Sequence, residues 1–175
     1  SHVKPILYRP FDRRLIFYHD SLVWRTVKQV MRHMLAGQNI ALASTRSVEA
    51  GDVFSHVFVT QHIMGHHAVS LKEVNYLFPL YLHPGSERLA LGTEPNLAPA
   101  FVAAMKERIG CEPTPEDIFH YIYGVLHAPT YRSRYAEFLK RDFPRIPLPA
   151  DDAAFRACAE VGEKLIDDAA IEKRA

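Results

Sequence analysis

Three histidines that lie close together, His62, His66 and His67, are the side chains best able to do chemistry. On a helix, His62 and His66 would share one face, as zinc ligands often do. However, no Glu follows His62 and Gly65 interrupts the segment, so the H-E-x-x-H pattern is not met. Histidine and the neighbouring Gln61 donate and accept hydrogen bonds, which suits them to base edges. We therefore predict no metal site and treat Gln61, His62, His66 and His67 as candidates for base contacts. A solvated polar loop is the alternative.

Arg46 and Ser47 lie in a second polar segment, residues 44–52, which follows a predicted strand. An arginine bonds guanine through two acceptors at once, and a serine reaches a base or a phosphate. Arg46 is therefore the leading single candidate for reading a base. The alternative is an exposed arginine that only adds charge to the surface.

Phosphate contacts need cationic side chains with local positive potential. The candidates are Arg13, Arg14, Lys28, Arg32 and Lys72. Arg13 and Arg14 follow a Pro-Phe-Asp turn, where Asp12 is placed to pair with one of the nearby arginines. For the arginines around this turn, including Arg9, a structural role is the favoured interpretation and a phosphate clamp is the alternative.

The sequence contains no complete catalytic constellation. Its serines lack the Gly-x-Ser-x-Gly context of a nucleophile elbow, and Cys111 and Cys158 lack the neighbouring histidine that activates a thiol. No G-x-x-x-x-G-K-[ST] loop, no Gly-rich methyl-donor loop and no Asn-Pro-Pro-Tyr or Asn-Pro-Pro-Phe tetrapeptide occurs. We predict that this chain has no catalytic residue and binds no cofactor.

A predicted sheet in the first half of the chain must position these candidates. Residues 6–18 form two extended segments around a tight bend, which predicts a hairpin. Apolar residues at three-to-four spacing predict a helix over 23–35, with a stop at Gly37. Strands are predicted at 39–43, 53–60 and 76–82, which are rich in β-branched, aromatic and leucine residues. The polar stretches 44–52 and 61–75 are expected to project from the sheet as loops.

The second half of the chain has a helical pattern. Helices are predicted from Pro99 to Ile109, from Pro115 to just before Pro129, from about Tyr131 to Leu139 and from Asp152 to Ile166. Thr114 supplies an N-cap for the second helix, followed by a first-turn proline and two acids. The tyrosines in this region, Tyr121, Tyr123, Tyr131 and Tyr135, are interpreted as core residues rather than as stacking platforms for unpaired bases.

The last predicted helix has an apolar face and a weak point. The apolar face is expected to contain Phe155, Cys158, Ala159, Val161 and Leu165. Gly162 is expected to weaken the helix, because glycine has a low helix propensity. Together the patterns predict an α+β fold, with an N-terminal twisted mixed sheet and one early helix, followed by a C-terminal group of three to four helices.

Length and composition predict one ordinary globular domain over residues 1–175, with 48% hydrophobic and 23% charged residues. No apolar run approaches the roughly 18 residues of a membrane span, so we expect a soluble, cytoplasmic protein. The net charge of +1 hides an asymmetry. Residues 1–92 hold ten Lys and Arg against six Asp and Glu, whereas residues 93–175 hold eleven against fourteen. A DNA-facing half joined to a partner-facing half would have this distribution.

A long run of aromatic, basic and proline positions is the most distinctive part of the chain. Residues 115–149 read PEDIFHYIYGVLHAPTYRSRYAEFLKRDFPRIPLP, and Tyr8-Arg9-Pro10-Phe11-Asp12 stands near the start. Together these residues resemble the C-terminal specificity region of the Type ISP restriction-modification enzymes. Those enzymes combine nuclease, ATP-driven translocase, adenine-N6 methyltransferase and target recognition in one chain. The resemblance spans roughly residues 5–165.

The resemblance implies an α+β target recognition domain, excised from a larger polypeptide, whose loops enter the major groove of double-stranded DNA. The helices from Pro99 onward would dock on the methyltransferase domain of that polypeptide. S-adenosylmethionine, ATP and Mg²⁺ are expected only in its other domains. Two alternatives stay open: a protein-interaction module that couples the methyltransferase to its neighbours without reading bases, and a small stand-alone enzyme that uses the histidines.

Overall fold

A computed structural model describes residues 2–24, 26–48, 53–84 and 92–171. The chain forms two compact units, the first made of Ser1–Thr45 with His56–Asn96 and the second of Arg46–Ser55 with Leu97–Ala175. The expectation of a single domain stays a prediction, because two compact units can unfold together or one at a time. Within the described residues, no helix is both long and apolar enough to cross a membrane.

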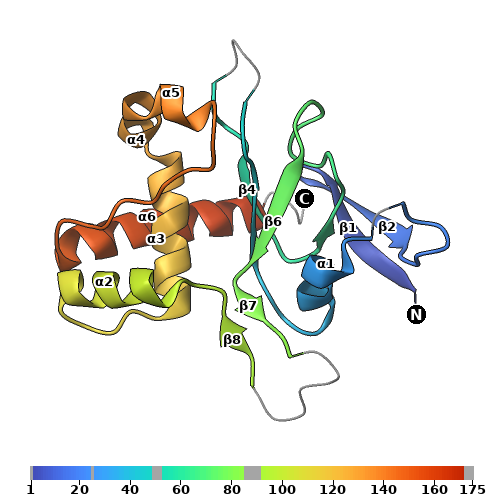
Figure 1. Ribbon diagram of the computed structural model, residues 1–175, viewed down its shortest axis with the longest axis horizontal. Helices are drawn as coiled ribbons and strands as arrows, with labels where there is room; N and C mark the ends of the chain where they lie inside the picture. The colour runs from blue at the N-terminus through green and yellow to red at the C-terminus, as the bar shows by residue number, and fades with distance from the viewer. Residues whose placement is uncertain (1, 25, 49–52, 85–91, 172–175) are drawn as a thin grey trace. The chain divides into compact units, whose positions relative to one another are not determined.

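The first unit begins with the hairpin that the sequence predicts (Figure 1). Strands β1 (Val3–Arg9) and β2 (Asp12–Phe17) pair antiparallel, and Phe11 takes a left-handed conformation with φ 63° in the turn. A short strand, β5 (Ile63–Met64), pairs parallel with β1 to give the order β2-β1-β5. The sequence predicts a loop over the whole of 61–75. That prediction is wrong for Ile63 and Met64, which form a strand of the sheet. Ile63 and Met64 are buried there, which is the physical reason.

A second sheet of the first unit has the order β4-β3-β6 and is antiparallel throughout. Its strands are β3 (Ala41–Thr45), β4 (Val57–Thr60) and β6 (Asn75–Pro79), and a further pair consists of β7 (Tyr81–Leu82) and β8 (Glu94–Pro95). The predicted strand 53–60 begins only at Val57, since Val53 is exposed. The predicted strand 76–82 is divided at Leu80, whose amide donates to the carbonyl of Ile40.

Helix α1 (Lys28–Leu35) is shorter than the predicted helix over 23–35. Val27 precedes it in a left-handed conformation, with φ 43° and ψ 48°, so the right-handed helix begins only at Lys28. The helix buries Met31 and Met34 in a core that includes Leu7 from β1 and Ile63 from β5. Lys28 and Arg32 stay on its exposed side.

The second unit is helical and has more helices than the predicted three to four. They are α2 (Pro99–Ile109), α3 (Pro115–His127), α4 (Pro129–Arg134), α5 (Ala136–Leu139) and α6 (Asp152–Ile171). Gly110 ends α2 with φ 75°, and Thr114 forms a capping box with Asp117 at the start of α3. The predicted helix over 131–139 is broken at Tyr135, which has φ −108° and ψ 17°. The α+β class, with sheets first and helices after, is confirmed.

Three of the four tyrosines are core residues, as predicted. Tyr121, Tyr123 and Tyr131 are buried, and Tyr135 is 39% exposed. Burial raises the pKa of Tyr121 and of Tyr123 to about 12, because the phenolate is poorly solvated there. The Tyr121 hydroxyl donates to the carbonyl of Pro147 at 2.9 Å, and the Tyr131 hydroxyl donates to that of Arg145 at 2.8 Å. The two bonds fasten the proline-rich connector to the helices.

Helices α3 and α6 cross in close contact, as Figure 1 shows in orange and red. Gly124 of α3 faces the backbone of Cys158, and Gly162 of α6 faces the backbone of His120. A Cβ atom at either glycine would overlap with those backbone atoms. The expectation that Gly162 weakens its helix stays a prediction, and the structure adds a second role, because the absent side chain is what lets the helices approach. The prediction for Val161 was wrong, since it is 52% exposed, whereas Phe155 and Ala159 are buried as predicted.

We predict that Gly162→Ala destabilises the protein by about 3 kcal/mol, because backbone atoms cannot move aside as a flexible side chain can. Helix propensity alone would make the same change stabilising by about 1 kcal/mol, so the two explanations differ in sign. Urea denaturation measures the free energy of unfolding. Gly92→Ala is the control, since a Cβ atom there meets nothing within 4 Å. A Gly162→Ala variant as stable as the wild type would contradict the close crossing.

Candidate nucleic-acid interface

The polar segment after β5, residues 65–75, is held by the buried side chain of Asn75. Its Oδ1 accepts hydrogen bonds from the amides of Val69, at 2.6 Å, and Ser70, at 3.1 Å. Its Nδ2 donates to the carbonyl of Glu73 at 2.9 Å, and its own amide donates to the carbonyl of His66. One amide side chain thus replaces the ladder of hydrogen bonds that this irregular segment lacks.

His66 and His67 lie together in this segment, with ring centroids 4.7 Å apart in an edge-to-face arrangement. His66 is exposed and His67 is half-buried, with its Nδ1 3.3 Å from the carbonyl of Glu73. Gln61 is exposed and His62 is half-buried, and the amide of His62 donates to Thr60 Oγ1 at 3.1 Å. Gln61 and His62 thus precede β5 in the chain, and His66 and His67 follow it. Gln61 and His66 are the most accessible of the four.

The arginines of the hairpin turn have structural partners. Arg9 donates to the carbonyl of His67 at 2.8 Å, which ties β1 to the segment 65–75. Arg14 pairs with Asp12 at 2.9 Å and lies over the ring of Tyr8, 3.9 Å from its centroid. The expected pairing of Asp12 with a nearby arginine is therefore observed. Arg13 is exposed on β2, opposite Leu7 of β1.

The other phosphate candidates of the first unit are exposed. Lys28 forms an ion pair with Asp20, which also accepts a hydrogen bond from Thr26. Lys28, followed by the Thr26 hydroxyl, lowers the pKa of Asp20, so this carboxylate is charged at neutral pH. Arg32 follows one turn later on α1, and Lys72 is exposed in the segment 65–75. Because exposed ion pairs contribute little to stability, the pair leaves Lys28 available to another anion.

Arg46 belongs to the second unit, where its partner comes from 96 residues further along the chain. Its Nε donates to Oδ1 of Asp142 at 3.1 Å, and its guanidinium carbon lies 6.0 Å from the centre of the Phe143 ring. The Phe143 amide and then Arg46 lower the pKa of Asp142, so the carboxylate stays charged. The Val48 amide also donates to the carbonyl of Lys140, and Ser47 between them is exposed.

The sequence-predicted readers thus fall into two groups. Gln61, His62, His66 and His67 are in the first unit, and Arg46 and Ser47 are in the second. That all of them line one surface stays a prediction. Residues 49–52 of the expected loop 44–52 lie outside the described residues. Asn75 and Asp142, which hold the candidates in place, were not found from the sequence, because only the fold brings them to their partners.

No group of three metal-binding side chains occurs in the part of the chain that the structure describes. The two cysteines lie in different surroundings. Burial raises the pKa of Cys158, which leaves its thiol protonated. Cys111 Sγ lies between two charged groups, 3.6 Å from a guanidinium nitrogen of Arg156 and 3.8 Å from Oδ1 of Asp152.

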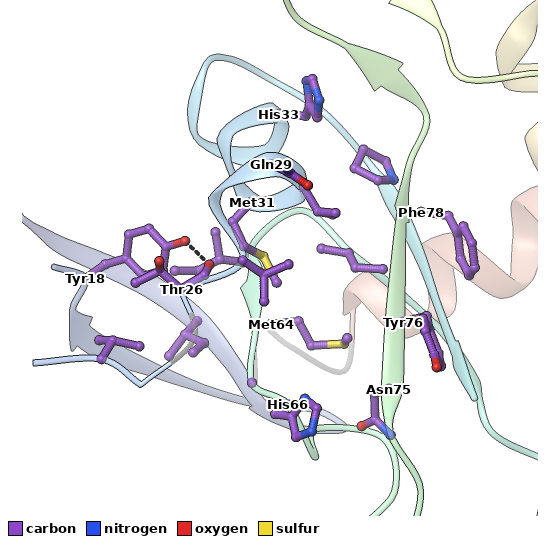
Figure 2. Close-up of a pocket in the computed structure, with 18 of the residues that line it drawn as sticks. Tyr18, Thr26, Gln29, Met31, His33, Met64, His66, Asn75, Tyr76 and Phe78 are labelled. Atoms are coloured by element: carbon purple, nitrogen blue, oxygen red, sulfur yellow. Dashed lines mark hydrogen bonds between the residues drawn. The ribbon is translucent and has the colours of Figure 1, made fainter. Parts of the chain in front are cut away.

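A cavity of about 520 Å³ lies within the first unit, between α1, β5 and β6 (Figure 2). Met31 and Met64 point into it, and Tyr18 closes one side by donating a hydrogen bond to the carbonyl of Thr26. His66 and Asn75 lie at its edge. Its walls are continuous with the apolar core, and its methionines are side chains that adapt to irregular space.

Comparison with known proteins identifies one family. The family model of the Type ISP C-terminal specificity domain matches residues 1–172. The resemblance carried by residues 8–12 and 115–149 is thereby confirmed. No curated protein sequence matches the chain.

Three solved structures have the same fold. In the cryoEM structure of a DrdV–DNA complex, the similar protein is 28% identical, with a TM-score of 0.78 over 95% of this chain and 15% of that chain. A nuclease-deletion mutant of the Type ISP restriction-modification enzyme LlaGI, in complex with a DNA substrate mimic, is 25% identical. Its TM-score is 0.70 over 97% of this chain and 14% of that chain. The ATP-dependent Type ISP restriction-modification enzyme LlaBIII bound to DNA is 18% identical, with a TM-score of 0.76 over 95% of this chain and 10% of that chain. At this identity the likeness is one of fold alone. The chain therefore spans only a small part of each of these proteins.

We predict that Asn75→Ala destabilises the protein by about 2 kcal/mol, because it leaves buried backbone groups of the segment 65–75 without partners. Hydrogen exchange at the amides of Val69 and Ser70 should accelerate, since Asn75 accepts from both. Val74→Ala is the matched control, because Val74 is an exposed residue of the same segment. Unchanged exchange at the two amides would mean that Asn75 does not hold this segment.

Proposed function

The chain belongs to the family of Type ISP C-terminal specificity domains, and from that premise we propose that it selects the DNA sequence on which a larger restriction-modification enzyme acts. The observation that carries the proposal is the family match over residues 1–172. Similarity to DrdV and LlaGI, each described in complex with DNA or a DNA mimic and at least 25% identical, supports double-stranded DNA as the partner.

The division of labour in the proposed enzyme follows from the chemistry that this chain lacks. Adenine methylation needs a methyl donor and a pocket for a flipped base, and translocation needs a nucleotide triphosphate with Mg²⁺. The sequence carries no motif for either reaction. We therefore assign S-adenosylmethionine, ATP and Mg²⁺ to other domains, and the methyltransferase domain to the partner of this chain in the same polypeptide. On this proposal the chain is a recognition module without catalytic residues.

Arg46 is the side chain best prepared to read a base. Asp142 holds its Nε, while its two terminal nitrogens have no hydrogen-bond partner among the described residues. Guanine presents O6 and N7 side by side in the major groove, and two parallel N–H donors match them. An arginine that is already oriented loses less side-chain entropy when it binds. Asp142 therefore favours binding of guanine by Arg46 through the terminal edge of the guanidinium.

Gln61 and His66 are the accessible readers of the first unit. Both residue types offer donors and acceptors, so they suit adenine or guanine edges. The hydrogen bonds of Asn75 and Arg9 fix the segment that carries His66 and His67. Rigid loops on a rigid scaffold give sequence discrimination, because a wrong base pair then cannot be accommodated by rearrangement.

We predict that Arg46→Ala weakens binding to the cognate duplex by about 1 to 3 kcal/mol and affects random duplex much less, because a base contact adds specificity. The proposed larger enzyme that contains this chain is first used to select duplexes from a random library, which defines the cognate site. Competition binding at fixed salt then compares the two duplexes. The selected consensus should lose a guanine at one position in the variant.

Arg156→Ala is the matched control for Arg46→Ala. Arg156 is an exposed arginine of the same unit whose Nε pairs with Asp152 at 2.8 Å, just as Arg46 pairs with Asp142. Equal losses on cognate and random DNA would make Arg46 a phosphate contact. A wild-type protein that selects no consensus would contradict the proposed function itself and favour a module that only couples protein domains.

A second prediction concerns the cofactor. Calorimetric titration of the 175-residue chain with S-adenosylmethionine should give no saturable heat. The proposed larger enzyme, which contains the methyltransferase domain, should bind it. The expectation follows from the missing methyl-donor loop. Saturable binding by the chain alone, with a dissociation constant in the micromolar range, would place the methyl-donor site in this chain.

A further inference from the structure

The second unit carries a group of cationic side chains that the distribution of charge along the sequence conceals. Residues 93–175 are net negative, yet residues 129–148 hold five Lys and Arg against two Asp and Glu. The excess of acids comes from the segments on either side. Phosphate binding depends on local potential, so the sign of the whole half does not decide it.

The fold gathers these charges around α5 and the connector that follows it. We define the basic surface as Arg46, Arg134, Lys140, Arg141 and Arg145. Asp142 lies among them, since both Arg46 and Arg145 act on its pKa. The backbone of Val48 binds that of Lys140, which brings the segment of Arg46 to the same place. Two carboxylates, Glu137 and Asp142, accompany the five cations, so the surface keeps a net positive charge.

Aromatic rings support the arginines of this surface. The guanidinium of Arg145 lies over Phe138, 4.9 Å from the ring centroid, and that of Arg134 lies 5.8 Å from the centroid of Tyr135. Stacking of this kind orients the planar group while its N–H edges stay accessible. The backbone of Arg145 is also fixed, because its carbonyl accepts the hydrogen bond of the buried Tyr131.

A nearby arginine, Arg132, serves the fold and is excluded from the surface. Its Nε donates to the carbonyl of Leu126 at 2.7 Å, and burial lowers its pKa. Arg134, Arg141 and Arg145, in contrast, are exposed, and no hydrogen bond from their guanidinium groups is found among the described residues. Lys140 is bound to Glu137.

We propose that the other cations of this basic surface bind the phosphate backbone of DNA beside the base that Arg46 reads. The inference rests on the proposed function and extends it, because it gives α5 and the connector after it a share in binding duplex DNA. The continuity with Arg46 favours DNA over an acidic protein. A base-reading side chain anchored at Asp142 brings the adjoining phosphates to the cations on either side of that carboxylate.

The test is the salt dependence of DNA binding by the proposed larger enzyme that contains this chain. Each phosphate contact contributes about 0.9 to the slope of log K against log salt concentration. The double substitution Arg141→Gln with Arg145→Gln should therefore lower the magnitude of the slope by roughly 1.8 between about 50 and about 200 mM salt. Affinity should fall by the same factor on cognate and random duplex, and the selected consensus should not change.

Two controls separate charge from packing. Arg108→Gln removes an exposed arginine from α2, a helix outside the basic surface, and should leave the slope at the wild-type value. Arg141→Lys with Arg145→Lys keeps both charges and should restore the slope even where the stacking on Phe138 is lost. A slope that changes equally in the lysine and glutamine variants would overturn the proposal, because packing rather than charge would then be responsible.

The outcomes also separate this inference from the proposed function. A wild-type protein that prefers its consensus, combined with a glutamine variant of unchanged slope, would overturn the basic surface and leave target recognition intact. A wild-type protein without any sequence preference, combined with a reduced slope in the variant, would support the basic surface and contradict target recognition.

Discussion

The close crossing of α3 and α6 is the constraint on which the second unit depends. Gly124 and Gly162 let the two backbones approach to a distance that no side chain would allow. The approach buries Tyr121 against Phe155, with ring centroids 5.4 Å apart, and gives the helical pair an apolar centre. From this pair the tyrosine hydroxyls reach the connector at Pro147 and Arg145. Packing at the glycines is thus transmitted to the segment that holds Asp142.

Side-chain amides play the corresponding part in the first unit, where the strands are short. Asn75 binds the backbone of the segment 65–75, and Asn39 donates to the carbonyls of His33 and Tyr81. Short strands leave many backbone groups without a partner in a ladder. An asparagine that offers one acceptor and two donors satisfies several of them at once. The bonds of Asn75 hold the backbone of the segment that carries His66 and His67.

The positions of the charged side chains matter more to this protein than its net charge. The chain is nearly neutral, and its exposed ion pairs, such as Arg46 with Asp142, add little to stability in water. They do fix the direction in which a guanidinium points. For a protein that must distinguish bases, direction matters more than attraction, because attraction to phosphates is the same for every sequence. The pair of Arg46 and Asp142 is better understood as geometry than as stabilisation.

The sequence by itself determined the features that depend on near neighbours. The hairpin turn, the Gly110 stop, the Thr114 capping box and the helices of the second half follow from hydrogen bonds and sterics within a few residues, and a run of aromatic and basic positions identified the family. Only the tertiary structure decided what depends on distant ones. The strand β5 inside a polar segment, the role of Gly162 and the partner of Arg46, 96 residues away, all require the path of the chain. The type of a residue does not indicate which distant residue the folded chain places next to it.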